Sequence, residues 1–163
     1  MKTLLLVRHA KSSWNNLSLS DFDRPLNDRG KEDAPLMAKR IKDRKIKIDC
    51  FVSSPAKRAK TTAKVFMKSY DQDKKDLVLI PTLYEASKND FYNAIEHMND
   101  KFDSIAVFSH NPGITEFVNS LTSHTIDNMP TCGVFAVSIP VKKWIDFKNT
   151  SKELLFFDFP KND

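Results

Sequence analysis

The chain has 163 residues, of which 40% are hydrophobic and 29% are charged, and its formal net charge is +5. Such a length and composition are ordinary for a globular protein, and we expect one domain over residues 1–163. Because the 21 acidic residues are interspersed with the 26 basic ones, the small positive excess argues against a nucleic-acid-binding protein.

The first predicted element is a buried strand over residues 3–7, followed at once by Arg8 and His9. Its apolar run is too short for a signal peptide or a membrane span, so we expect a cytoplasmic protein with no membrane partner. Imidazole can act as a neutral nucleophile, and guanidinium groups bind phosphate oxygens through paired N–H donors. A histidine just past a strand end stands where α/β proteins place their ligands.

Further apolar runs predict strands over residues 48–52, 77–80, 104–108, 134–139 and 153–159. Helical periodicity between the first four strands, and after the fourth, predicts helices near 31–44, 59–70, 90–98 and 114–121. Asn27 or Asp28 is expected to cap the first helix, and Ser54 the second, with Pro55 as its first residue. The alternation predicts an α/β three-layer sandwich with a mostly parallel sheet, to which the last two strands add an antiparallel edge.

The ends of the later strands carry polar side chains as well. Arg58 follows the second strand, Glu85 the third and His110 the fourth. In an open α/β sheet, ligands bind beyond the carboxyl ends of the strands, so these residues should converge with Arg8 and His9. We therefore expect one polar site at this edge of the sheet.

This set of side chains suits phosphoryl transfer through a covalent phosphohistidine. One histidine would attack phosphorus in line, while Arg8, Arg58 and the second histidine would neutralise the phosphoryl oxygens. Glu85 could protonate the leaving group and then activate water, provided that a closed or crowded pocket surrounds it. The ligand spacings of metallohydrolases are absent, so we expect neither a metal ion nor another cofactor.

Four segments, in this order, resemble the histidine phosphatase superfamily, whose members share the phosphoglycerate mutase-like fold. They read LVRHAKSSWN at 6–15, DFDRPLNDRG at 21–30, SSPAKRAKTTA at 53–63 and SHNPG at 109–113. Within the superfamily, the chain is most similar to the short, cap-less SixA-like phosphohistidine phosphatases. The resemblance implies His9 as nucleophile, Arg8, Arg58 and His110 as ligands of the phosphoryl group, and Glu85 as proton donor.

The resemblance also assigns two residues before the first predicted helix. Asn15 falls where many members of the family place a phosphate-contacting asparagine. Arg24 would face the pocket mouth or pair with Asp21 or Asp23. Ala10 replaces the glycine that usually follows the histidine, which is tolerable unless the position requires a positive φ.

The implied activity is that of a metal-independent phosphatase acting on phosphohistidine of a signalling or phosphotransfer protein, or on small phosphate esters. Two alternatives stay open, a non-catalytic phosphate-binding regulatory module and a phosphoglycerate mutase-type isomerase. The intact His9 argues against the first, because a binding module needs no nucleophile. The ASKN sequence after Glu85 lacks the arginine and glycine-rich continuation of mutases and argues against the second. The oligomeric state and any partner protein stay open.

Overall fold

The computed structural model describes residues 1–162 and joins six strands into one sheet. The strands are β1 (Lys2–Arg8), β2 (Cys50–Ser53), β3 (Val78–Leu79), β4 (Ser104–Ser109), β5 (Val134–Ile139) and β6 (Glu153–Asp158). Their order across the sheet is β3-β2-β4-β1-β5-β6. The β1–β4, β4–β2 and β2–β3 pairs are parallel, whereas β5 is antiparallel to both β1 and β6. The expected mostly parallel sheet with an antiparallel edge is confirmed.

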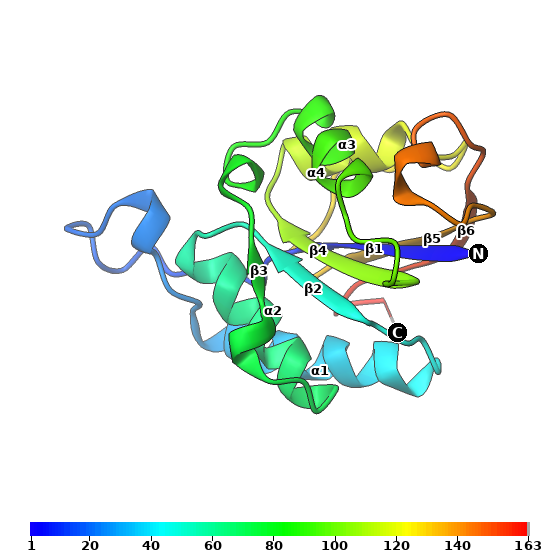
Figure 1. Cartoon of the computed structure of the whole chain (residues 1–163). Coiled ribbons are helices and arrows are strands. Elements are labelled where there is room, and N and C mark those ends of the chain that lie inside the picture. The colour runs from blue at the N-terminus through cyan, green and yellow to red at the C-terminus, as the bar shows by residue number, and fades with distance from the viewer. Residues whose placement is uncertain (163) are drawn as a thin grey trace.

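Four α-helices complete a three-layer arrangement (Figure 1). They are α1 (Asp28–Asp43), α2 (Lys57–Ser69), α3 (Lys88–Glu96) and α4 (Gly113–Asn119). Short 3-10 helices occur at η1 (Asp21–Asp23), η2 (Lys74–Asp76), η3 (Pro81–Leu83) and η4 (Trp144–Asp146). In Figure 1, α1 and α2 lie on one face of the sheet, and α3 and α4 lie on the other. No helix within residues 1–162 has the length and apolar character needed to cross a membrane.

The alternation of side chains along the strands explains the two layers of helix. Leu4 and Leu6 of β1 pack into a core cluster with residues of α3 and α4, including Phe91 and Phe117. Leu5 and Val7 point the other way and join a second cluster with residues of α1 and α2. Because successive strand residues face opposite sides, a strand covered on both faces must be apolar throughout, as the central part of β1 is.

The structure settles one predicted helix start and corrects the other. Asn27 caps α1, since its side chain accepts a hydrogen bond from the Gly30 amide. The predicted cap of the second helix at Ser54 is wrong, because α2 begins only at Lys57. The Ser54 amide still donates to the carbonyl of Phe108 at 2.9 Å, which continues the β2–β4 pairing and delays the helix.

Strand register brings the two histidines of the predicted site together. Arg8 at the end of β1 pairs with Ser109 at the end of β4, so His9 and His110 follow neighbouring strand ends. The His9 amide donates to the Ser109 carbonyl at 3.2 Å, which extends this pairing by one residue. The rings of His9 and His110 consequently lie with their centroids 5.1 Å apart.

A close approach at Gly113 fixes the segment that carries Glu85. A Cβ atom at Gly113, the first residue of α4, would lie 2.1 Å from the carbonyl oxygen of Ala86. Only a residue without a side chain permits this contact. The loop after β3 is thereby held against the start of α4, next to the end of β4.

Candidate active site

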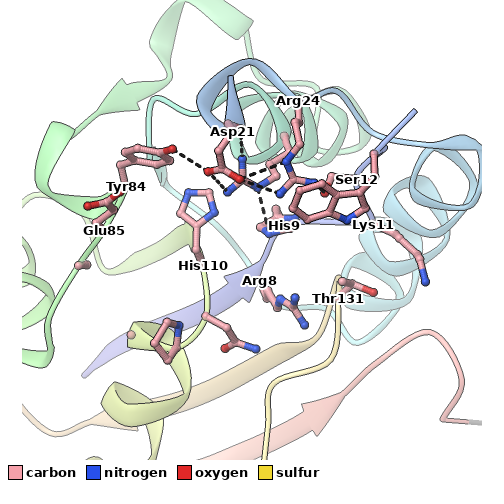
Figure 2. A pocket seen from close by; sticks show the side chains of 16 residues that line it. Arg8, His9, Lys11, Ser12, Asp21, Arg24, Tyr84, Glu85, His110 and Thr131 are labelled. Carbon is pink, nitrogen blue, oxygen red and sulfur yellow. Dashed lines mark hydrogen bonds and ion pairs between the residues drawn. The ribbon is translucent and has the colours of Figure 1, made fainter. Parts of the chain in front are cut away.

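A cavity of about 750 Å³ lies at the carboxyl ends of β1, β2 and β4 (Figure 2). Its polar lining residues come from segments that are far apart in the sequence. They include Arg8, His9, Lys11, Ser12, Asp21, Arg24, Arg58, Tyr84, Glu85, His110, Asn111 and Thr131. Of the site residues predicted from the sequence, all except Asn15 line this cavity.

His9 is buried, with 6% of its surface exposed, and its ring is held at both nitrogens. Nδ1 lies 2.7 Å from the carbonyl oxygen of Ala10, which can only accept, so the proton of the neutral ring is on Nδ1. Nε2 therefore carries the lone pair, and it accepts a hydrogen bond from Nε of Arg58 at 3.3 Å. The pKa of His9 is lowered to about 3, chiefly by burial and also by nearby His110, Arg58 and Arg8, although the hydrogen bond to the Ala10 carbonyl acts in the opposite direction. The ring is neutral at physiological pH and presents an unprotonated Nε2.

His110 is also buried, and one of its nitrogens lacks a partner. Nε2 lies 2.8 Å from the hydroxyl oxygen of Ser54, which already accepts from the Ala56 amide at 3.2 Å. We assign the Ser54 hydroxyl as the donor to Nε2, which places the proton of the neutral ring on Nδ1. Nδ1 is buried with no hydrogen-bond partner. Burial, followed by the charge of Arg58, lowers the pKa of His110 to about 3.

Arg8 supplies a second buried donor without a partner. Its Nη1 donates to the carbonyl of Met129 at 2.9 Å, but its Nε is buried and unpaired. Burial, together with the neighbouring Arg58, lowers the pKa of Arg8. Within residues 1–162, the buried side-chain polar atoms without a partner are this Nε and His110 Nδ1. An unsatisfied buried donor costs about 1–3 kcal/mol, so both atoms point to a ligand that carries acceptors.

Asp21 lies at the centre of an ionic network, of which the sequence suggested only a pair with Arg24 (Figure 2). Its carboxylate accepts from Arg58 Nη2 at 3.0 Å, from Arg24 at 2.9 and 3.1 Å, and from the Tyr84 hydroxyl at 2.6 Å. The Asp21 carbonyl also accepts from Arg58 Nη1 at 2.6 Å. The hydrogen bond from Tyr84 and the two guanidinium groups hold the pKa of Asp21 well below its usual range. Asp21 therefore fixes the orientation of the guanidinium group that contacts His9.

Arg24 is buried within the same network. Beside its pair with Asp21, its Nη1 donates to the Ser12 hydroxyl at 2.6 Å. Its guanidinium also lies 3.5 Å from the centre of the Trp14 ring. Arg24 thus both lines the cavity and pairs with Asp21, the two placements that the sequence left open.

Two predicted residues lie away from the buried donors. Glu85 lines the cavity wall with an exposed side chain, so the crowded surroundings expected for it are not present in this structure. Asn15 is exposed and does not contribute to the cavity lining. Its amide donates to the Ser13 hydroxyl at 3.1 Å, a local turn contact within an outlying loop. Ala10 is buried without a positive φ, so its methyl group introduces no backbone strain.

The balance of charge in the cavity favours an anion. Arg8, Lys11, Arg24 and Arg58 oppose the two carboxylates of Asp21 and Glu85, while both histidines are neutral. No group of three or more His, Cys, Asp or Glu residues in the described part of the chain is arranged to hold a metal ion. Three guanidinium groups and one ammonium group surround the buried N–H donors. Together they form a binding site for an anionic group such as phosphate.

Comparison with known proteins identifies the family. The model of the histidine phosphatase superfamily (branch 1) matches residues 4–102. The chain is 30% identical over 152 residues to an uncharacterized chloroplastic protein of Arabidopsis thaliana, covering 88% of this chain and 69% of that protein. It is 32% identical over 91 residues to the 2,3-bisphosphoglycerate-dependent phosphoglycerate mutase of Bartonella henselae, covering 55% of this chain. That alignment spans only 44% of the mutase.

The fold also matches solved structures. The structure of the protein histidine phosphatase SixA complexed with tungstate superimposes with a TM-score of 0.83 and covers 98% of both chains, at 21% identity. The chain therefore belongs to the histidine phosphatase superfamily, and the expected phosphoglycerate mutase-like fold is confirmed. A histidine-type phosphatase is the class of enzyme that this family assignment supports.

The neutral histidines predict how stability depends on pH. The pKa of both His9 and His110 is about 3 in the folded protein, against 6.5 as the ordinary value, so the unfolded chain binds more protons between these limits. Stability should be fully present above pH 6.5 and should fall as the pH drops toward 3. Each ring adds a slope of up to about 1.4 kcal/mol per pH unit.

Guanidinium unfolding at a series of pH values would measure this slope. His9→Asn should reduce the slope of the unfolding free energy against pH by the contribution of one ring. His97→Gln, a change of an exposed histidine, should leave this slope as in the wild type. An unchanged slope in His9→Asn would contradict a buried neutral ring at this position.

Proposed function

We propose that the chain is a metal-independent phosphatase that forms a phosphohistidine intermediate on His9 and acts on phosphohistidine of a protein. The observation that carries this proposal is the unprotonated Nε2 of His9 beside Arg58, next to two buried donors that lack partners. A phosphoryl group would supply the acceptors for Arg8 Nε and His110 Nδ1. The same phosphoryl group would lie next to Nε2 of His9.

The first step would transfer the phosphoryl group to the enzyme. The Nε2 lone pair of His9 forms a bond to phosphorus, and the bond from phosphorus to the substrate nitrogen or oxygen breaks with its electron pair. The leaving nitrogen or oxygen takes up a proton from Glu85 or from solvent. Arg8, Arg58 and His110 stabilise the charge on the phosphoryl oxygens in the transition state. The Ala10 carbonyl, which accepts from Nδ1, stabilises the positive charge of the phosphorylated ring. For this step, Arg58 Nε must transfer its hydrogen bond from His9 to a phosphoryl oxygen.

The second step would release phosphate. A water oxygen attacks phosphorus, and the electron pair of the P–N bond returns to Nε2. The proton of the water passes to Glu85 or to solvent, and orthophosphate leaves with the neutral ring of His9 restored. We place Glu85 in this role because its carboxylate lines the same cavity as His9 and His110.

The exposed position of Glu85 favours phosphohistidine over alkyl phosphates as the substrate. An alkoxide is a poor leaving group and needs a well-held acid, whereas an imidazole departs readily. The side chains of Lys11, Trp14 and Glu85 line the cavity and are exposed, so the cavity wall opens to solvent. Such an opening suits a phosphorylated side chain on a protein better than a fully enclosed metabolite. Small phosphate esters remain the second substrate class.

A substrate panel tests the proposal. We expect hydrolysis of a phosphohistidine peptide with a higher kcat/KM than that of an alkyl phosphate. Sugar phosphates and nucleotides belong in the same panel, which would rank the substrate classes. Failure to hydrolyse either phosphohistidine or an aryl phosphate, while orthophosphate still binds, would favour a non-catalytic binding module instead.

The similarity to phosphoglycerate mutases makes an isomerase the second candidate. Incubation with 3-phosphoglycerate and a bisphosphate primer would detect it through formation of 2-phosphoglycerate. We expect release of orthophosphate rather than isomerisation, because an open site lets water reach the phosphoenzyme.

We further propose that the 163 residues act as one domain, because all six strands belong to one sheet. Cys50 and Cys132 are buried and free, as expected in a reducing compartment, and we propose a cytoplasmic location.

A further inference from the structure

A loop over residues 13–25 leaves the body of the protein beside the cavity and returns to the same place. Its base is closed by hydrogen bonds from the Ser13 amide to the Pro25 carbonyl at 2.8 Å and from the Asn27 amide to the Lys11 carbonyl at 3.0 Å. Figure 1 shows this loop, in blue, projecting away from the sheet and its helices. It contains η1, and through η1 it carries Asp21 into the site.

The projecting loop exposes an unusual amount of apolar surface. Trp14, Leu17, Leu19 and Phe22 are 69%, 93%, 38% and 36% exposed, and we call these four side chains the apolar rim. Ten large hydrophobic side chains are exposed in residues 1–162, and four of them fall within residues 14–22 of this loop. Apolar side chains gathered in one exposed segment mark an interaction site more often than scattered ones do.

Two side chains of the apolar rim contact residues that line the cavity. The Trp14 ring lies on the guanidinium of Arg24, which pairs with Asp21, which in turn pairs with Arg58. At the other end, the Phe22 ring meets the Tyr84 ring edge-on at 5.1 Å. These contacts hold Trp14 and Phe22, the two ends of the rim, at a fixed place relative to the nucleophile, as a docking surface requires.

We propose that the apolar rim docks a folded protein that presents the phosphorylated histidine, through an apolar patch next to that residue. This inference rests on the proposed function and names the surface that selects the partner. Trp14 both lines the cavity and belongs to the rim, so whatever carries a phosphoryl group into the cavity lies against the rim. The cationic cavity takes the phosphoryl group, and the rim takes the apolar surface around it. A small ester that fills the cavity would not need Leu17, whose side chain is almost fully exposed.

The test compares a phosphoprotein with a small substrate. The double variant Leu17→Ser/Leu19→Ser removes apolar surface without touching a cavity residue. As substrates we choose a histidine-containing phosphocarrier protein, phosphorylated with phosphoramidate, and p-nitrophenyl phosphate. We expect kcat/KM on the phosphoprotein to fall about tenfold or more through KM, the size of effect given by losing an interface contact. Activity on p-nitrophenyl phosphate should be unchanged.

The matched control is Leu36→Ser/Ile145→Ser, which removes two side chains that are 43% and 57% exposed elsewhere on the surface. It should leave both activities as in the wild type. Wild-type kinetics of the rim variant on the phosphoprotein would overturn the docking proposal, and so would an equal loss on both substrates. If the wild type hydrolyses the aryl phosphate but not the phosphoprotein, the proposed substrate class fails as well. Sedimentation that shows a rim-dependent dimer would assign the surface to a second copy of this chain and overturn the proposal.

Discussion

Replacing His9 with asparagine is expected to abolish turnover of every phosphate substrate. The ring supplies an unprotonated nitrogen, Nε2, which accepts a hydrogen bond from Arg58, and asparagine offers no nucleophilic nitrogen in its place. Removal of a covalent nucleophile lowers kcat on the order of 10⁴- to 10⁶-fold in other hydrolases. Hydrolysis of p-nitrophenyl phosphate measures the loss. Chemical quenching of the wild type should trap an acid-labile, alkali-stable phosphoenzyme that the variant lacks.

Binding of orthophosphate should survive the same replacement. The donors Arg8 Nε and His110 Nδ1 remain in the variant, so the anion keeps its partners. His124→Asn, a change of an exposed histidine, is the matched control and should retain full activity. Activity of His9→Asn within about tenfold of the wild type would show that the chemistry does not pass through this ring.

Glu85→Gln is expected to separate the two substrate classes. If Glu85 donates the proton to the leaving group, its loss should reduce hydrolysis of an alkyl phosphate about 10²–10⁴-fold. Hydrolysis of a phosphohistidine peptide should fall less than about tenfold, because imidazole needs little help to leave. The measurement is kcat/KM on both substrates for the wild type and the variant.

The control for this pair of measurements is Glu32→Gln, which changes an exposed carboxylate on α1 outside the cavity. It should alter neither activity. Equal losses of Glu85→Gln on both substrates would remove Glu85 from the role of acid, and the exposed position of its side chain would then explain why.

Local patterns in the sequence predicted most of the fold. The strand at 134–139 coincides with β5, and the other five predicted strands overlap the observed ones. The prediction at Ser54 failed because a serine before a proline is a typical helix start, whereas here the strand pairing with β4 continues through Ser54. Pairing between strands that are 55 residues apart along the chain leaves no signal in a short window of sequence.

The candidate site was also predicted only in part from the sequence. Arg8, His9, Arg58 and His110 were predicted because each follows a recognisable strand, and the topology of a parallel sheet gathers strand ends. Asp21 and Tyr84 were missed, since their hydrogen bond joins residues 63 positions apart and neither follows a strand directly. The acidic DFD segment was visible in the sequence, but nothing local showed which of its carboxylates would meet Arg58.

The sequence by itself determined that a histidine and an arginine would follow the first strand of an α/β sheet, because apolar periodicity is encoded locally. The tertiary structure alone decided which nitrogen of that histidine bears the lone pair. It did so through the Ala10 carbonyl, the burial that keeps the ring neutral, and the guanidinium that Asp21 fixes in front of it. Protonation and orientation depend on which groups surround a side chain in space, and those neighbours come from four separate segments of the chain.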